Sequence, residues 1–266
     1  MTGVVLLTLT ALGGCRREAR VHTVTLAGST SVQPFAELLA EVFMSRHPEI
    51  SVNVQGGGSS AGIEAALSGA ADIGMSSRHL LPAEQAQLRP VLIAQDAVAV
   101  VVHPSNPVRG LTRDQARDIF AGRIRNWSQV GGPPSAIHVI LREEGSGTRA
   151  SFEEMIMEGS DPDPRALVQD SNGAVRETVA HDPGAIGYIS LGLVDERVRP
   201  VSIDGMTPSV PAVLEGRYQL VRPFLFVLKG EPREPALLFL DFVLGPGQAI
   251  LREEGLIPAA KGSGNP

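Results

Sequence analysis

The stretch HTVTLAGSTS, residues 22–31, is a β-rich segment that ends in a Gly/Ser/Thr turn. Its alternating apolar and polar residues predict a strand over 22–27. Apolar residues at helical spacing follow over 35–46, so the turn joins a strand to a helix. A helix start carries unpaired N–H groups and a partial positive charge, so a turn of this kind can hold an anion. The stretch therefore predicts both an α/β unit and a candidate binding position.

The same arrangement of strand, turn and helix occurs twice more along the chain. A strand expected over 50–54 runs into Gly58-Ser59-Ser60-Ala61-Gly62, and a short helix is expected over 63–67. A strand expected over 136–141 runs into Arg142-Glu143-Glu144-Gly145-Ser146-Gly147-Thr148, with a helix over 150–157. Each turn taken alone is most simply a helix cap. Three such turns, with Arg142 as a full positive charge, favour one shared oxyanion site.

The remaining segments predict two α/β lobes. Further elements are expected as strands over 71–75, 97–102 and 220–228, and as helices over 113–120 and 236–251. Because strands and helices alternate, each lobe should contain a central, mostly parallel sheet flanked by helices. In such sheets ligands bind at the carboxyl ends of the strands, which is where the three turns fall. A length of 266 residues suits two lobes of roughly 100 residues each.

The first fifteen residues resemble a bacterial lipoprotein signal peptide. An apolar run over 4–12 is too short to span a membrane, and Leu12-Gly13-Gly14-Cys15 resembles a lipobox, whose cysteine is acylated. Residues 16–21 would then form a tether, and the protein would be lipid-anchored on the periplasmic or extracellular face of the cell envelope. Cys15 is the only cysteine, which excludes an internal disulfide.

Composition limits the partners and the chemistry. A net charge of −6 disfavours nucleic acid, so an anion must be held by local donors and not by a basic surface. The histidines form no spaced metal-ligand pair and no GxxxxGK[ST] motif occurs, so neither a metal nor a cofactor is expected. One enzymatic alternative remains. The segment 58–62 matches the G-x-S-x-G nucleophile elbow, in which Ser60 would attack with Asp170 and His181 as partners.

Six motifs in order resemble the phosphate-binding proteins of bacterial Pst-type ABC transporters. They are Gly28–Ser31 with Pro34, Gly57–Ser60 with Gly62, Asp72–Arg78, Arg142–Thr148, Asn172–Ala174 and Asp182–Tyr188. Each motif alone is weak, whereas all of them in register, together with the lipobox, are specific. The resemblance runs from about Val24 to Pro258, which is nearly the whole chain after the tether.

The resemblance implies a type II periplasmic-binding-protein fold, in which two crossings near Asp96–Val98 and Arg217–Leu220 join the lobes. Lobe 1 would comprise residues 22–97 and 218–266, and lobe 2 residues 98–217. The protein would not be an enzyme. It would capture inorganic phosphate as a monomer and deliver it to the transmembrane subunits of an ABC permease. The implied ligand contacts are Thr30, Ser31, Ser59 and Ser77 from lobe 1, and Arg142, Ser146, Gly147 and Thr148 from lobe 2.

The chain departs from the family pattern at two positions. Some relatives carry an aspartate in place of Ser77, and that aspartate accepts a proton from phosphate and so rejects fully ionised oxyanions. Ser77 therefore leaves sulfate, molybdate and tungstate open as alternative ligands. Relatives commonly have an aspartate where this chain has Glu144, and Glu144 is expected to brace Arg142.

Several residues of these motifs are given less specific roles. Arg78, directly after Ser77, is either a second cationic contact to the ligand or a surface residue, and the surface position is the simpler role. Asn172 and Gly173, near the start of a helix, are open between approaching the ligand and capping the helix, and capping is the simpler role. Glu143 is left open between facing solvent and holding the Arg142 guanidinium.

Overall fold

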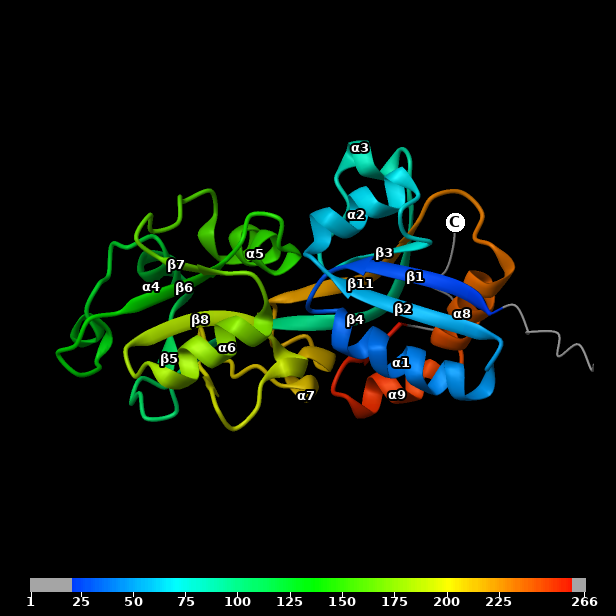
Figure 1. Ribbon diagram of the computed structural model, residues 1–266. Coiled ribbons are helices and arrows are strands. Elements are labelled where there is room, and N and C mark those ends of the chain that lie inside the picture. Colours follow the sequence, from blue (N-terminus) through cyan, green and yellow to red (C-terminus); the bar gives the residue numbers. More distant parts are fainter. Residues whose placement is uncertain (1–20, 260–266) are drawn as a thin grey trace, which may run out of the picture.

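The computed structural model describes residues 21–259 (Figure 1). The expected signal peptide over 1–15 with Cys15, and the expected tether apart from Val21, lie outside the described residues. The strands are β1 (His22–Gly28), β2 (Ile50–Gly56), β3 (Ile73–Ser76), β4 (Arg89–Val102), β5 (Gly110–Leu111), β6 (His138–Arg142), β7 (Leu167–Gln169), β8 (Ala185–Ser190), β9 (Arg199–Pro200), β10 (Ser202–Ile203), β11 (Val221–Leu228) and β12 (Ile257–Pro258). The α-helices are α1 (Gln33–Arg46), α2 (Ser59–Ser68), α3 (Pro82–Gln85), α4 (Arg113–Phe120), α5 (Gly147–Phe152), α6 (Asn172–His181), α7 (Val210–Leu214), α8 (Glu234–Leu244) and α9 (Gly247–Glu253). Short 3-10 or π turns lie at Trp127–Val130, Glu153–Met157 and Leu191–Leu193.

The main sheet is mixed, with the order β2-β1-β3-β11-β4-β8-β6-β7. β1 is parallel to β2 and β3, and β6 is parallel to β7 and β8. The two central strands, β4 and β11, are antiparallel to each other and to their outer neighbours β8 and β3. The expectation of a mostly parallel sheet is therefore right for the outer strands and wrong for the centre, where the strands that link the two ends of the molecule run.

β4 is one continuous strand that serves both ends of the sheet. Its first part, Arg89–Ala97, pairs with β11, and its last part, Val98–Val102, pairs with β8. Sequence analysis detected only the second part, because residues 97–102 are uniformly apolar whereas Arg89, Gln95 and Asp96 interrupt the first part. The chain passes between the two ends a second time just before β11, where the amide of Val98 donates to the carbonyl of Leu220 at 2.8 Å.

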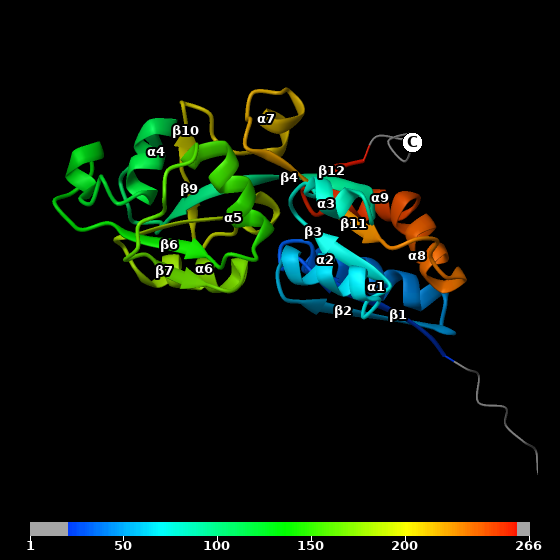
Figure 2. The ribbon, with the colours of Figure 1, turned by 90° about the horizontal axis from the view of Figure 1, so that it is seen from above.

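The remaining elements gather in two groups at the ends of β4 (Figures 1 and 2). We call the group of β1–β3, α1–α3, β11, α8 and α9 the first half, and the group of β5–β10 and α4–α7 the second half. Each half has its own apolar core, and large aromatic side chains fill both. The first core contains Phe35, Phe43, Phe224, Phe226 and Phe239, and the second contains Phe120, Trp127, Phe152 and Tyr188. Each such side chain contributes about 1.5–3 kcal/mol through burial.

Helix boundaries differ from the expectations where turn chemistry decides them. α2 begins at Ser59, directly after the Gly-rich turn, and not at residue 63. The long helix expected over 236–251 is two helices, because Gly245 and Pro246 separate α8 from α9. Thr112 caps α4, accepting from the amide of Gln115 at 3.1 Å.

Among residues 21–259, no single helix is long and apolar enough to cross a membrane. α8 and α9 together meet the criteria of length and composition, but their axes bend by 51° at the break between them. Phe239, Phe242 and Val243 of α8 and Leu251 of α9 are buried in the core of the first half, which accounts for the apolar character of the pair.

Candidate functional site

The turns after β1, β2 and β6 meet between the two halves. The hydroxyl oxygens of Ser31, after β1, and Thr148, after β6, lie 2.8 Å apart and are both buried. The amide of Ser60, after β2, donates to the carbonyl of Gly145, after β6, at 3.1 Å. The three turns singled out in the sequence therefore form one cluster, with two turns supplied by the first half and one by the second.

Arg142 is the buried cation of this cluster. It is the last residue of β6, it is 1% exposed, and its backbone amide donates to the hydroxyl of Tyr188 at 3.3 Å. Its Nε and Nη2 donate to the two carboxylate oxygens of Glu143 at 2.9 Å each. Nη2 also donates to Thr30 Oγ1 at 3.1 Å and to the carbonyl of Asp170 at 3.2 Å. Nη1 is buried and has no hydrogen-bond partner among the described residues, which leaves two N–H donors for a ligand.

Glu143, and not Glu144, braces this guanidinium, so the expectation for Glu144 is wrong. The turn explains the difference. The amide of Ser146 donates to the carbonyl of Glu143 at 3.0 Å, which places Glu144 and Gly145 at the two central positions of a β-turn. Glu144 is exposed there, while Glu143 leaves the strand with its carboxylate turned back to Arg142.

The hydroxyls of three buried serines of the first half lie together beside the turn that follows Arg142. Ser29 Oγ donates to Ser77 Oγ at 2.9 Å, and Ser59 Oγ lies 3.3 Å from the same atom. The backbone amide of Ser77 donates to Ser59 Oγ at 3.0 Å. Ser59 and Ser77 were expected as ligand contacts, and the structure brings both of them into this cluster. Ser29 was quoted in its motif but not expected among the contacts.

The second half closes directly on these serines. Ser146 caps α5, accepting from the amide of Arg149 at 3.2 Å. Gly147 follows, and a Cβ placed on it would lie 2.3 Å from Ser59 Oγ and 2.7 Å from Ser77 Oγ. Only glycine permits this approach, because real Cβ atoms do not come so close to other atoms.

Asn172 belongs to the cluster and is not the helix cap, which was the simpler of the two roles considered for it. The cap of α6 is Ser171, which accepts from the amide of Ala174 at 3.1 Å. Asn172 is 1% exposed, and its Nδ2 donates to Ser31 Oγ at 2.8 Å. Its Oδ1 accepts from the amide of Ser190 at 3.1 Å, which fixes the orientation of the side-chain amide.

A second buried cation, Arg222, also touches the cluster and was missed in the sequence. Its Nη2 donates to Ser31 Oγ at 3.1 Å, and its Nε and Nη2 donate to Asp96 Oδ2 at 3.0 and 2.9 Å. Burial lowers the pKa of Arg222, and it raises the pKa of Asp96. The available signal was a lone arginine within the apolar stretch 220–228, since a charge in a buried strand requires a partner.

Arg78 is not the exposed residue that the surface interpretation predicted. Its side chain is 13% exposed and forms a two-pronged ion pair with Glu84, at 2.9 Å to each carboxylate oxygen. The hydrogen bond from Arg78 holds the pKa of Glu84 below its usual value. Because Glu84 already neutralises this guanidinium, its charge is not directed into the cluster.

The geometry gives no support to a serine nucleophile. Ser60 is exposed, and its hydroxyl accepts from Arg78 Nη2 at 3.5 Å. His181 Nδ1 lies 2.7 Å from the carbonyl of Glu177 in its own helix, and Asp170 contacts Arg142 through its backbone carbonyl. Over residues 21–259, no hydrogen bond joins the three proposed triad members, and no group of His, Cys, Asp and Glu side chains is placed to hold a metal ion.

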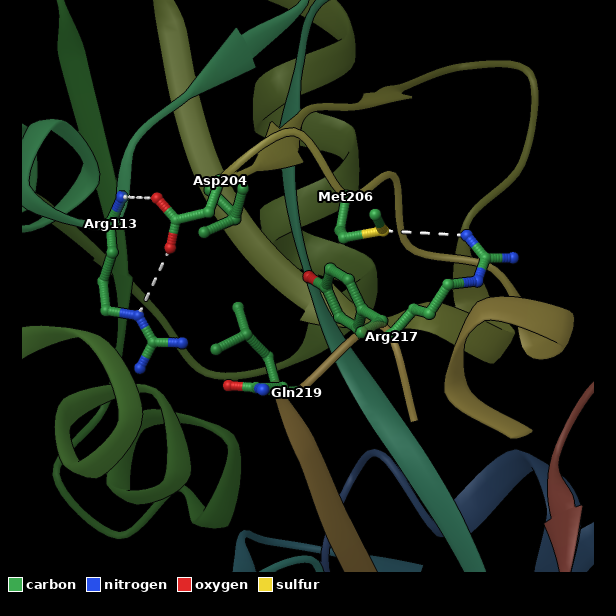
Figure 3. Close-up of a pocket in the computed structure, with 8 residues that line it drawn as sticks. Arg113, Asp204, Met206, Arg217 and Gln219 are labelled. Carbon is green, nitrogen blue, oxygen red and sulfur yellow. Dashed lines mark hydrogen bonds and ion pairs between the residues drawn. The ribbon is translucent and has the colours of Figure 1, made fainter. Parts of the chain in front are cut away.

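A separate pocket of about 290 Å³ lies in the second half beside the chain segment that enters β11 (Figure 3). Its two arginines already have partners. The backbone amide of Arg113 donates to Asp204 at 2.9 Å, and its side-chain Nη1 donates to the carbonyl of Met155. Arg217 Nε donates to Glu215 at 2.6 Å. The pocket shares no lining residue with the cluster, so the cluster is the better candidate for an anion site.

Comparisons with known proteins agree on one family. Residues 16–246 match the family model for the PBP superfamily domain. The chain is 33% identical over 242 residues to the phosphate-binding protein PstS of Bacillus subtilis, covering 89% of this chain and 80% of that protein. Among solved structures, a substrate-binding protein from Clostridium perfringens, assigned to a phosphate ABC transporter and containing bound phosphate, has a TM-score of 0.87. It is 40% identical, over 90% of this chain and 100% of that one.

A second solved structure supports the same assignment. The ABC-type phosphate transport receptor of Vibrio cholerae has a TM-score of 0.74 and 39% identity, covering 89% of this chain and 100% of that one. These similarities extend over both halves and both central strands. The chain therefore has the α/β fold of these receptors and belongs to the PstS phosphate-binding proteins of ABC transporters, a non-enzymatic family within the PBP superfamily.

Proposed function

We propose that this protein captures inorganic phosphate in the buried cluster between its two halves and delivers it to an ABC permease. The observation that carries the proposal is the Arg142 guanidinium. It is 1% exposed, its Nη1 donors are unused among the described residues, and its Nη2 contacts Thr30 Oγ1 of the same cluster of hydroxyls. An oxyanion is the ligand that such a set of donors suits. The Clostridium perfringens structure contains phosphate, which supports the choice of anion.

The two halves would act as the lobes of a type II periplasmic-binding-protein fold. Lobe 1 would comprise residues 22–97 and 218–266, and lobe 2 residues 98–217. Support comes from β4, which changes its pairing partner between Ala97 and Val98, and from the separate apolar cores on either side. On this proposal the lobes open to admit phosphate by bending at the two crossings, and the contacts across the cluster belong to the closed form.

Each lobe would contribute one side of the ligand cage. Lobe 1 would offer Thr30, Ser31, Ser59 and Ser77, and lobe 2 would offer Arg142, Ser146, Gly147 and Thr148. Most of these are neutral donors, and Glu143 balances the charge of Arg142. Affinity would then come from hydrogen bonds and excluded water more than from net charge, which fits a chain with a net charge of −6.

Other tetrahedral oxyanions are the competing ligands. Neutral donors alone also suit sulfate, molybdate and tungstate, and Ser77 stands where an aspartate would favour a protonated anion. The names of the relatives favour phosphate, because the Bacillus subtilis, Clostridium perfringens and Vibrio cholerae proteins are all phosphate binders or phosphate transport components. In this protein the phosphate proton would be accepted by a serine oxygen or a backbone carbonyl.

The location follows from the family in outline. PstS proteins act outside the cytoplasm, and this chain is extracytoplasmic on the same grounds. The finer proposal is that residues 1–15 are removed as a signal peptide and that Cys15 carries a lipid. A monomer tethered through residues 16–21 would then reach the transmembrane subunits of its permease from the outer face of the membrane.

Titration calorimetry tests this function. We expect the wild-type chain to bind phosphate with a Kd of about a micromolar or tighter, roughly −8 kcal/mol, with negligible sulfate binding between pH 5 and 9. Arg142→Met should weaken phosphate binding at least about a hundredfold, because it removes charge-assisted hydrogen bonds worth about 1.5–3 kcal/mol each. Arg252→Met, at an exposed arginine of α9, is the matched control and should change nothing. Equal affinity for sulfate would overturn the phosphate assignment.

A further inference from the structure

The hydroxyl of Ser31 has more polar neighbours than a serine usually has. Its Oγ lies 2.8 Å from Thr148 Oγ1, 2.8 Å from Asn172 Nδ2 and 3.1 Å from Arg222 Nη2. A hydroxyl group has one proton to donate and two lone pairs that accept. The Asn172 Nδ2 and the Arg222 Nη2 are nitrogens that can only donate, so they occupy both lone pairs of the Ser31 hydroxyl. The proton of Ser31 must therefore point outward, to Thr148 or to a ligand oxygen beside it.

Arg222 is rigidly held in this role. It lies directly opposite Asp96 across the β11–β4 ladder, and Nε and Nη2 both donate to Asp96 Oδ2. The two side chains are each 1% exposed, and the guanidinium carbon lies 5.4 Å from the centre of the Phe224 ring. Because β4 and β11 are the strands that join the halves, this ion pair links the connection between the halves to Ser31.

The ion pair is poorly explained as a stabilising element. Two charges taken out of water cost several kcal/mol each, and apolar residues of similar size are often equally stabilising. The hydrogen bonds of Arg222 are not all made to Asp96. Nη2 is shared with Ser31, which belongs to the candidate site and comes from a different element of the first half. The shared bond gives the pair a use that an apolar replacement could not supply.

We propose that Arg222, fixed by Asp96, is a positioning residue of the oxyanion site, and that together with Asn172 it makes Ser31 an obligatory hydrogen-bond donor. This inference rests on the proposed function. An obligatory donor favours an unprotonated ligand oxygen at that point, because an anionic oxygen accepts a stronger hydrogen bond than a P–OH oxygen does. Arg222 thus contributes to affinity and to ligand orientation through Ser31.

A double-mutant cycle read by titration with inorganic phosphate tests this coupling. One change is Ser31→Ala, and the other replaces the ion pair without leaving a lone charge, as Asp96→Leu with Arg222→Met. When Ser31 is present, we expect the combined Asp96→Leu and Arg222→Met change, the charge-free pair, to weaken phosphate binding about tenfold. This is the effect of one hydrogen bond to a charged group. In the Ser31→Ala background, the same change should have less than about a twofold effect, because its target is gone.

The possible outcomes separate this inference from the proposed function. Failure of the wild-type chain to bind phosphate would overturn the function itself. Binding by the wild type, with an equal loss from the charge-free pair in both backgrounds, would overturn only the positioning role and indicate a general effect on the fold. Arg199→Met is the matched control, since Arg199 is a partly buried arginine that donates to the carbonyls of Asn106 and Val108. It should leave the affinity unchanged.

Two further variants keep the test decisive if the charge-free pair does not fold. Arg222→Lys retains a charge beside Asp96 but lacks the planar fork that reaches Asp96 and Ser31 together, so the same dependence on Ser31 is expected. Asn172→Ala removes the other donor to Ser31 without changing any charge. It should show the same non-additivity with Ser31→Ala, and additive losses for both variants would contradict the proposal.

Discussion

Arg142 brings a full positive charge to a place from which water is almost excluded. Its carboxylate partner, Glu143, is 28% exposed, so the pair lies at the edge of the buried cluster. Such a pair is weak evidence for stability, yet removal of one partner leaves the other charge uncompensated. An anionic ligand could partly replace that compensation. The charge balance at Arg142 therefore predicts that loss of the carboxylate destabilises the free protein more than the liganded protein.

Glu143→Gln tests this balance, with Glu144→Gln as its matched control. Without phosphate, we expect Glu143→Gln to lower the free energy of unfolding by about 1–3 kcal/mol, because Arg142 keeps its charge and loses the opposing one. Saturating phosphate should reduce the difference in unfolding free energy between Glu143→Gln and the wild type. Glu144→Gln should stay within about 0.5 kcal/mol under both conditions, as for other exposed positions. Urea denaturation with and without phosphate measures both, and equal effects of the two variants would contradict the assignment of Glu143.

Gly147 carries a second prediction at this scale. In Gly147→Ala the new methyl group would meet Ser59 Oγ and Ser77 Oγ at 2.3 and 2.7 Å, so the halves could not approach as closely. Overpacking of this kind costs about 1–3 kcal/mol, which corresponds to a roughly ten- to hundredfold loss of phosphate affinity. The thermal unfolding of the free protein should change little, since alanine is the better helix former.

Gly173→Ala is the control for this variant. Gly173 is the second residue of α6, next to Asn172 of the cluster, and a Cβ there would have only Ser171 Oγ nearby, at 4.0 Å. Calorimetry should give wild-type affinity for Gly173→Ala. An affinity for Gly147→Ala equal to that of this control would show that the observed approach of the two halves is not needed for binding.

The residue scale also shows what sequence reasoning could and could not reach. Gly, Ser and Thr at strand ends carry a local signal, because their role depends on neighbours one to four positions away. The roles of Asn172 and Arg222 depend on partners in other elements, and that of Glu143 depends on how the turn after β6 directs its carboxylate. Ser31 lies 141 positions from Asn172 and 191 from Arg222, so no local pattern connects them.

At the scale of elements, periodicity gave the strands and helices but not the strand partners. The alternation over β1 and β2 and the apolar run in β4 identify strands by the side chains they bury. The pairing of β4 with both β11 and β8 depends on the path of the whole chain. The antiparallel centre of the sheet was missed for this reason. The split between α8 and α9 was locally visible, since Gly245-Pro246 interrupts the helical pattern.

The short helix α3 supplies a pH-dependent prediction. Glu84 of α3 accepts from Arg78 and from the backbone amide of Leu81, and the first of these lowers its pKa in the folded chain. A lowered folded-state pKa contributes stability above the unfolded-state value, about 4.3 for glutamate, and this contribution is lost as the pH falls below it.

Glu84→Gln should therefore be less stable than wild type at pH 7, and the difference should shrink as the pH falls below about 4.3. Urea midpoints of the two proteins at pH 7, 5, 4 and 3.5 give the comparison. A difference that stayed constant or grew toward low pH would show that Glu84 is not stabilised as a carboxylate by Arg78.

At the scale of the whole molecule, the two halves are joined by two strands and closed by hydrogen bonds across the cluster. Ser31 meets Thr148, the amide of Ser60 meets the carbonyl of Gly145, and Ser151 Oγ donates to the carbonyl of Ser77 at 3.3 Å. Few such bonds and two linking strands make a closure that a ligand can bias by a few kcal/mol. Length and repeated motifs predicted two α/β units, whereas their closed arrangement required the three-dimensional structure.

The most direct measurement of the central claim is a crystal structure determined in the presence of phosphate. The account predicts one tetrahedral anion between the halves, bonded to Arg142 and to hydroxyls from both sides, with Ser31 as a donor to an unprotonated oxygen. An anion ordered instead in the pocket between Arg113 and Arg217 would contradict it. So would a cluster without an anion at a phosphate concentration that saturates binding in solution.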